Sequence, residues 1–106
     1  MSQYLVVLVA AGSEVEAQHI ADQLVERKLA ACANLTPVTS VFRWKGRIQH
    51  EGEVLLITKT RSELFDQLQD AVKTLHSYDV PEIIALPIFA GSAEYLKWLG
   101  DETLAS

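Results

Sequence analysis

The stretch "VTSVFRWKGRIQHEGEVLLITKT", residues 38–60, decides the fold. Up to Trp44 its side chains alternate between two faces, as those of a β-strand do. Lys45-Gly46 then supplies a two-residue turn, because glycine adopts positive φ without steric cost. The chain returns through residues 47–60. The pattern therefore predicts one long antiparallel hairpin, with a bulge at Gly52 inside the return strand.

A strand and a helix precede this hairpin. Residues 4–11, "YLVVLVAA", are a continuous apolar run typical of a buried strand. Ser13 followed by Glu16 is typical of a capping box at a helix start. Apolar residues then recur at three- and four-residue spacing, which predicts a helix that ends near Leu29.

A second helix and strand follow the hairpin. Residues 64–75 carry another apolar stripe, and either Thr60 or Ser62 is expected to cap that helix. Residues 82–89, "EIIALPIF", predict a fourth strand, in which Pro87 indicates a sheet edge or a bulge. Farther on, Ser92 is placed to begin a short C-terminal helix and Gly100 to end it.

The order of these elements predicts an α+β fold of the ferredoxin-like, split βαβ type. It is β-α-β-β-α-β plus a short C-terminal helix, with an antiparallel sheet and a long central hairpin. In the segments "LVVLV" (5–9) and "VLLI" (54–57), both the odd-numbered and the even-numbered residues are apolar, so we expect both faces of the sheet to be buried. Two long helices cover one face. We expect another subunit, more than the C-terminal helix, to cover the other.

Length and composition bound the function. The 106 residues predict a single domain, residues 1–106. The net charge of −5 argues against a nucleic-acid partner. One cysteine excludes an intramolecular disulfide, and the apolar run near the N-terminus is too short for a signal peptide or membrane span. We therefore expect a cytoplasmic protein that binds neither nucleic acid nor membrane.

The segment "LHSYDVPEI", residues 75–83, gathers most of the groups capable of chemistry. His76 follows the second helix, where it either bonds the last carbonyls or acts as a ligand. Tyr78 either packs under the loop or faces a ligand. Glu82 opens an apolar strand and needs a partner if it is buried. Lys59 ends the apolar segment "VLLIT" and either reaches water or meets Glu82 or an anionic ligand.

The hairpin tip predicts an interface. Phe42 and Trp44 share one face of the first hairpin strand, and Trp44 lies between two basic residues. An aromatic residue flanked by arginine is a favoured interface anchor. Because the chain is acidic, we favour a contact between subunits over nucleic-acid stacking.

Cys32 is interpreted as a small buried residue, the alternatives being a nucleophile or a soft-metal ligand. No phosphate loop, metalloprotease or serine-hydrolase motif occurs, so no catalytic residue is expected.

Four blocks resemble the family of CutA divalent-cation tolerance proteins. They are "ERKLAACANL" (26–35), "VFRWKGRIQHEGEVLLITKTR" (41–61), "LHSYDVPEIIALPI" (75–88) and "YLKWL" (95–99). The resemblance implies a non-enzymatic homotrimer assembled through its hairpins, similar in architecture to the PII signalling proteins. It implies a role in divalent metal (copper) tolerance, with a metal or small anionic ligand bound at clefts between subunits. The alternative is a PII-like sensor of a small ligand without a metal role.

The resemblance also assigns expected sites. Lys59, Tyr78 and Glu82 would line the ligand cleft, and His76 would be the metal ligand. Phe42 and Trp44 would lie at the trimer interface. Family members credited with copper binding carry a thiol near the end of the first strand and a second histidine before His76, where this chain has "VLVAAG" (7–12) and Leu75. With one imidazole left, Cu²⁺ or another divalent cation is expected to bind only weakly, so no cofactor is firmly assigned.

Two other classes share the order of elements. An acylphosphatase-like enzyme needs an arginine after the first strand, and "AAGSEVEA" (10–17) has none. An RNA-recognition module displays aromatic residues on its central strands, and "VVLV" and "VLLI" have none. The sequence therefore favours a trimeric binding protein over both.

Overall fold

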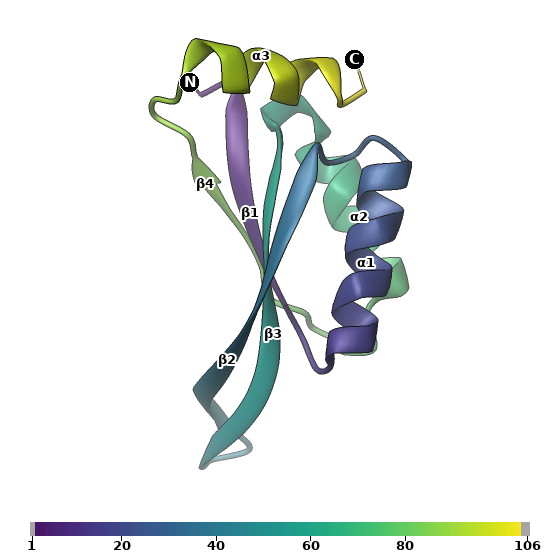
Figure 1. The fold of residues 1–106 in the computed structure, drawn as a ribbon. Coiled ribbons are helices and arrows are strands. Elements are labelled where there is room, and N and C mark those ends of the chain that lie inside the picture. Colours follow the sequence, from purple (N-terminus) through teal and green to yellow (C-terminus); the bar gives the residue numbers. More distant parts are fainter. Residues whose placement is uncertain (1, 105–106) are drawn as a thin grey trace.

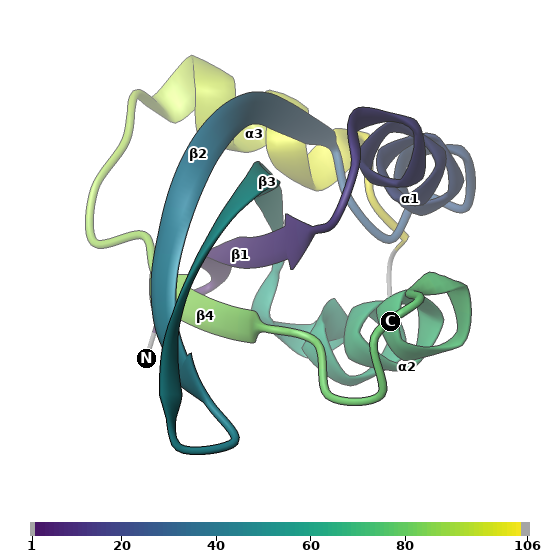
Figure 2. The ribbon, with the colours of Figure 1, turned by 90° about the horizontal axis from the view of Figure 1, so that it is seen from below.

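A computed structural model describes residues 2–104. Four antiparallel strands form one sheet in the order β2-β3-β1-β4, and two helices pack on one of its faces (Figure 1; Figure 2). The arrangement confirms the predicted α+β fold and its split βαβ order. The elements are β1 (Tyr4–Ala11), α1 (Glu14–Glu26), β2 (Cys32–Trp44), β3 (Arg47–Arg61), the short 3₁₀ helix η1 (Ser62–Leu64), α2 (Phe65–Leu75), β4 (Ile83–Pro87) and α3 (Ala93–Asp101).

The core lies between the sheet and helices α1 and α2. Alternate residues of β1 point toward the helices, and Val7, Val9 and Ala11 on that face are fully buried, whereas Val6 and Leu8 on the other face are only partly buried. Apolar stripes of both helices meet this face. The fully buried side chains include Val7, Val9, Ile20, Leu24, Leu56, Leu68 and Val72.

The hairpin of β2 and β3 is longer and more regular than expected. Its pairing runs without interruption from Cys32 opposite Lys59 to Trp44 opposite Arg47. Lys45 and Gly46 have φ values of 50° and 77°, and two positive φ values are typical of the type I′ turn. Gly52 pairs directly with Thr39. The predicted bulge is therefore wrong, because this glycine continues a regular strand.

Helix caps were predicted with mixed success. Ser13 and Ser92 accept the backbone N–H of the third residue beyond them, each at 3.2 Å, as predicted for α1 and α3. Helix α2 instead follows η1, and no side chain caps it. The Thr60 hydroxyl donates to the Leu29 carbonyl, and the Ser62 hydroxyl donates to the Ser2 carbonyl. The predicted cap of α2 is wrong because tertiary contacts use both hydroxyls.

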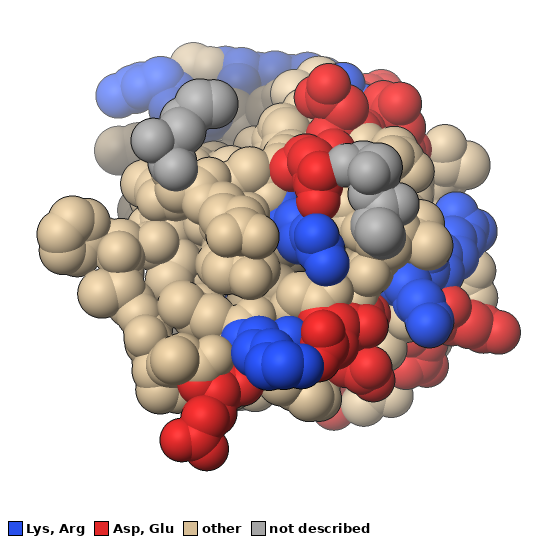
Figure 3. Space-filling view, turned by 90° about the horizontal axis from the view of Figure 1, so that it is seen from above, with Lys and Arg blue, Asp and Glu red and all other residues tan. Residues whose placement is uncertain are grey.

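The second face of the sheet is only partly covered. Leu8 and Ile57 are half-buried there, and Ile84 and Leu86 on β4 are 48% and 46% exposed. Helix α3 crosses the end of the sheet far from the hairpin tip (Figure 1). Seen from that end, acidic and basic groups lie side by side around a largely uncharged surface, and further basic groups lie along the distant upper edge of the view (Figure 3).

Strand β4 forms one edge of the sheet, and Pro87 is its last residue. Proline lacks the N–H that a central strand needs, so an edge suits it. The edge interpretation of Pro87 is confirmed. Strand β2 forms the opposite edge along its 13 residues.

Candidate functional site

A groove of about 760 Å³ lies between the hairpin and the segment that joins α2 to β4. We call it the hairpin groove. It brings together four of the residues expected at functional sites, namely Phe42, Trp44, Tyr78 and Glu82. Its full lining is Ala10, Ser40, Val41, Phe42, Trp44, Gln49, Glu51, Glu53, Tyr78, Asp79, Val80 and Glu82.

Tyr78 is held in the groove at both ends. Its backbone N–H donates to Nδ1 of His76 at 3.0 Å, and its hydroxyl donates to Oε2 of Glu53 on β3 at 2.9 Å. A Cβ atom on Gly12 would lie 3.0 Å from that hydroxyl, so a larger residue at this position would press on the Tyr78 ring. Burial raises the pKa of Tyr78 to about 12, with the Glu53 hydrogen bond and nearby carboxylates adding to the effect. Tyr78 is therefore a neutral hydrogen-bond donor in the groove.

His76 lies beneath the groove and has no free nitrogen. The side chain is fully buried. Its Nε2 lies 2.7 Å from the Ala10 carbonyl, so this nitrogen carries the proton, and Nδ1 accepts the Tyr78 N–H. Both nitrogens are thus used within the subunit. His76 therefore has no free lone pair to donate to a metal ion, as its expected metal role would require. The residue instead holds the loop against β1.

Glu16 on α1 fixes the same loop, although sequence reasoning assigned it only to a helix cap. Its carboxylate accepts the Ser77 N–H at 2.6 Å, the Ser77 hydroxyl at 3.1 Å and the Gly12 N–H at 3.3 Å. Burial raises the pKa of Glu16, but the hydrogen bonds from Ser77 and Gly12 outweigh it and hold the pKa below its ordinary value. The carboxylate is ionised at neutral pH.

The charges of the hairpin groove are all acidic. Glu51, Glu53, Asp79 and Glu82 contribute carboxylates, and no lysine or arginine lines it. Glu51 and Glu53 alternate along β3 and so share one face with Phe42, which pairs with Gln49 across the hairpin. That alternation was visible in the sequence and could have shown that Glu51 and Glu53 lie on the same face of the hairpin as Phe42.

Lys59 lies elsewhere. It pairs with Val6 on β1, whereas Ile83, next to Glu82, pairs with Val9. Three residues of strand separate the two levels by about 10 Å, and β1 lies between them. The Lys59 ammonium donates to the Asn34 side chain. The expectation that Lys59 meets Glu82 is therefore wrong within one subunit.

Cys32 is half-buried at the far end of β2. Its sulfur lies 3.6 Å from the Tyr95 hydroxyl on α3. This hydrogen bond, together with burial, raises the pKa of Tyr95. Cys32 thus contacts the C-terminal helix and takes no part in the hairpin groove.

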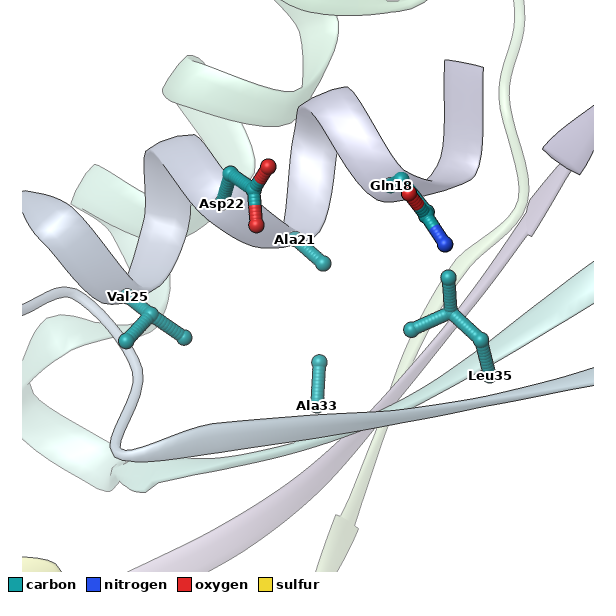
Figure 4. A pocket seen from close by; sticks show the side chains of 6 residues that line it. All are labelled: Gln18, Ala21, Asp22, Val25, Ala33 and Leu35. Atoms are coloured by element: carbon teal, nitrogen blue, oxygen red, sulfur yellow. The ribbon is translucent and has the colours of Figure 1, made fainter. Parts of the chain in front are cut away.

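A second groove, of about 420 Å³, separates α1 from β2 (Figure 4). Ala21 and Val25 from α1 face Ala33 and Leu35 from β2, and Asp22 is the one carboxylate in its lining. None of the residues expected at a site lies here. The hairpin groove is therefore the better candidate.

Residues 2–104 contain no group of three or more histidine, cysteine, aspartate or glutamate side chains placed to hold a metal ion. Among the helices of the same residues, none combines the length and the hydrophobicity that a membrane span requires.

Curated relatives share most of this chain. It is 50% identical over 99 residues to the divalent-cation tolerance protein CutA of Thermus thermophilus, covering 92% of this chain and 96% of the relative. It is 45% identical over 103 residues to the chloroplastic protein CutA 1 of Oryza sativa, but spans only 58% of that longer protein. These names describe cation tolerance or CutA and no catalytic reaction.

Solved structures agree with the fold. CutA1 of Oryza sativa gives a TM-score of 0.96 at 43% identity, covering 99% of this chain and 97% of that one. CutA of Archaeoglobus fulgidus, described as periplasmic, gives 0.92 at 43% identity over 93% and 97% of the two chains. Because relatives are named chloroplastic or periplasmic, the cytoplasmic location of this protein stays a prediction.

The family described as CutA1 divalent ion tolerance protein matches residues 5–102. The match includes the hairpin, the segment from His76 to Glu82 and α3. This chain therefore belongs to the CutA1 divalent ion tolerance protein family.

Proposed function

We propose that the protein acts in divalent-cation tolerance as a non-enzymatic homotrimer that binds a ligand in the hairpin groove, at the boundary between subunits. The observation that carries the proposal is the convergence of Phe42, Trp44, Tyr78 and Glu82 on one groove. Interface and ligand residues expected separately from the sequence lie on the same surface. A neighbouring subunit that covers the aromatic residues would also close the groove.

The exposed apolar surface supports assembly. Trp44 is 59% exposed, and the second face of the sheet leaves Ile84 and Leu86 half-exposed. Apolar side chains grouped in this way are typical of a surface that another protein chain covers. The long free edge of β2 offers unpaired backbone groups to a neighbour as well.

The acidic lining supports a cation more than the anionic ligand expected from the sequence. Lys59, the basic residue of that expectation, is bound to Asn34 and does not line the groove. Direct copper binding is proposed as weak, because His76 has both nitrogens engaged. We therefore propose that the groove contributes to cation tolerance by recognising a ligand and that it catalyses no reaction.

Two measurements test the proposal. Light scattering on the purified protein at micromolar concentration should give the mass of a trimer, and a monomer mass would refute it. In cells that lack their own CutA-family protein, the wild-type chain should improve growth under excess divalent cations. Glu82→Gln should reduce that benefit, whereas Glu26→Gln, the same charge change at the exposed end of α1, should not. Equal growth with and without the wild-type chain would contradict the tolerance role.

A further inference from the structure

We propose that His76 acts as a pH-dependent switch that sets the position of Tyr78 in the hairpin groove. The neutral ring holds the Tyr78 backbone, whereas the protonated ring donates to Glu16 and releases Tyr78. The switch operates within one subunit. Only its consequence for ligand recognition rests on the proposed function, because Tyr78 lines the groove.

The Nδ1 atom of His76 lies between one donor and one acceptor. It accepts the Tyr78 N–H at 3.0 Å, and it lies 3.9 Å from Oε2 of Glu16. On the neutral ring, whose proton is on Nε2, this nitrogen has a lone pair and uses the donor. On the protonated ring it carries a hydrogen and needs the acceptor. One proton therefore exchanges the partner of Nδ1.

The other contacts of His76 persist in both states. Nε2 lies 2.7 Å from the Ala10 carbonyl on β1, and it donates to that oxygen whether the ring is neutral or charged. The backbone N–H of His76 donates to the Val72 carbonyl at 2.9 Å at the end of α2. The ring thus keeps its place between β1 and α2, and the exchange affects only the segment that follows it.

The surroundings of the ring provide for its charge. The side chain is fully buried, and a buried charge needs a partner of opposite sign. Glu16, on α1 and 17% exposed, is its one ion-pair partner within residues 2–104. From β1 the ring meets the uncharged Ala10 carbonyl. The Tyr78 ring lies 4.7 Å away, and its hydroxyl is neutral because burial raises its pKa to about 12.

Glu16 is ionised when the ring takes up a proton. Burial raises the pKa of Glu16, but the hydrogen bonds from Ser77 and Gly12, together with the charge of His76, hold it below its ordinary value. Histidine is the side chain that ordinarily changes charge between about pH 5 and 8. The carboxylate is therefore present as an acceptor throughout the range in which imidazoles titrate.

Release of the Tyr78 N–H changes the hairpin groove. Tyr78 also donates its hydroxyl to Glu53 on β3 at 2.9 Å, so the residue connects the His76 side of the loop to the hairpin. Ser77 is bound to Glu16 through its N–H and its hydroxyl, and it follows the carboxylate as that group approaches Nδ1. Proton uptake therefore moves the wall of the groove that Tyr78 forms.

Nuclear magnetic resonance on the isotope-labelled full chain in its native assembly tests the switch, with EDTA present so that no metal competes for the ring. Between about pH 8 and pH 5, the His76 ring signals and the Tyr78 amide signal should titrate with one shared midpoint. Hydrogen-exchange protection of the Tyr78 amide should fall about two- to tenfold, the usual effect of losing one hydrogen bond. The His76 amide, bonded to Val72, is the internal control and should keep its protection.

Three variants identify the partners. Glu16→Gln removes the charge that stabilises the protonated ring, so the shared midpoint should move to lower pH. Glu14→Gln removes the same charge from an exposed position in the same turn of α1 and should move it far less. His76→Asn supplies an acceptor oxygen that takes up no proton, so the Tyr78 amide should lose its pH response. If that variant does not fold, the comparison of the two glutamate variants still decides.

Four results would overturn the proposal. The ring signals stay constant over this pH range, or they titrate while the Tyr78 amide does not follow. Equal shifts in Glu16→Gln and Glu14→Gln would show that Glu16 is not the second partner. A Tyr78 response that persists in His76→Asn would place the titrating group elsewhere. None of these results affects the mass and growth tests of the proposed function, so the two proposals fail separately.

Discussion

Replacing Glu16 by glutamine should destabilise the protein through the loop that carries Tyr78. The side chain is 17% exposed, and its carboxylate accepts three hydrogen bonds, from the Gly12 N–H and from the N–H and hydroxyl of Ser77. Glutamine keeps one acceptor oxygen but places an amide N–H where Ser77 or Gly12 donates. At least one charged hydrogen bond is lost and one donor is left facing another.

The magnitude follows from those contacts. A hydrogen bond to a charged group contributes about 1.5–3 kcal/mol, and partial exposure reduces the effect. We expect Glu16→Gln to lower the free energy of unfolding by about 2 kcal/mol. Glu14→Gln is the matched control, because Glu14 is exposed in the same first turn of α1. Its interaction with the helix dipole is worth about 0.5 kcal/mol.

The pH dependence gives an independent measure. Because the pKa of Glu16 lies below its ordinary value in the folded protein, the ionised carboxylate stabilises the fold. This contribution is complete above the ordinary carboxyl pKa of about 4.3 and is lost as pH falls through the lower folded pKa. Guanidinium unfolding at one protein concentration, repeated between pH 7 and pH 3, should show wild type and Glu16→Gln converging at low pH.

Two results would refute the reasoning. If Glu16→Gln and Glu14→Gln lower the free energy of unfolding by the same amount, the hydrogen bonds to Ser77 and Gly12 contribute nothing beyond the interaction with the helix dipole. If the difference between wild type and Glu16→Gln stays constant down to pH 3, the carboxylate is not the stabilising form. Either result would also remove Glu16 as the residue that positions Tyr78.

Three further predictions concern the core, the interface and copper. Thr58 is buried and its hydroxyl has no partner within residues 2–104, so Thr58→Val should raise the free energy of unfolding by about 1 kcal/mol; a decrease would reveal a missing partner. Trp44→Ala should weaken assembly by about 2 kcal/mol or more in a dilution series followed by light scattering, and an unchanged midpoint would contradict its interface role. Calorimetry should find copper(II) binding no tighter than about micromolar and unaffected by His76→Ala, whereas nanomolar binding lost in that variant would disprove the ligand count.

The sequence predicted those features that depend on local pattern. The hairpin followed from strand alternation on both sides of Lys45-Gly46, and the caps of α1 and α3 followed from Ser13 and Ser92. Apolar periodicity located both long helices because packing against a sheet imposes it. These signals lie within a few residues of one another along the chain.

Features that depend on distant contacts escaped prediction. Glu16 and Ser77 are 61 positions apart, and no local pattern links them. Thr60 looked like a helix cap, but its hydroxyl reaches a carbonyl 31 positions away. A contact between Lys59 and Glu82 was one of the alternatives for Lys59, because the register of β1 with β3 and β4 was unknown. Tertiary register, more than residue type, decides which charged groups meet.

The projecting end of the hairpin has a consequence for local opening. Residues 41–48 are all exposed and extend beyond α1 and α2 (Figure 1), and a two-stranded ribbon alone is only marginally stable in water. Its amide protons therefore exchange with solvent through fraying of a few pairs, whereas those around Leu56 exchange only when the whole subunit unfolds. Any chain that docks on the ribbon slows exchange first at its tip. The exchange rates of the amides at the hairpin end thus show whether another chain is bound there.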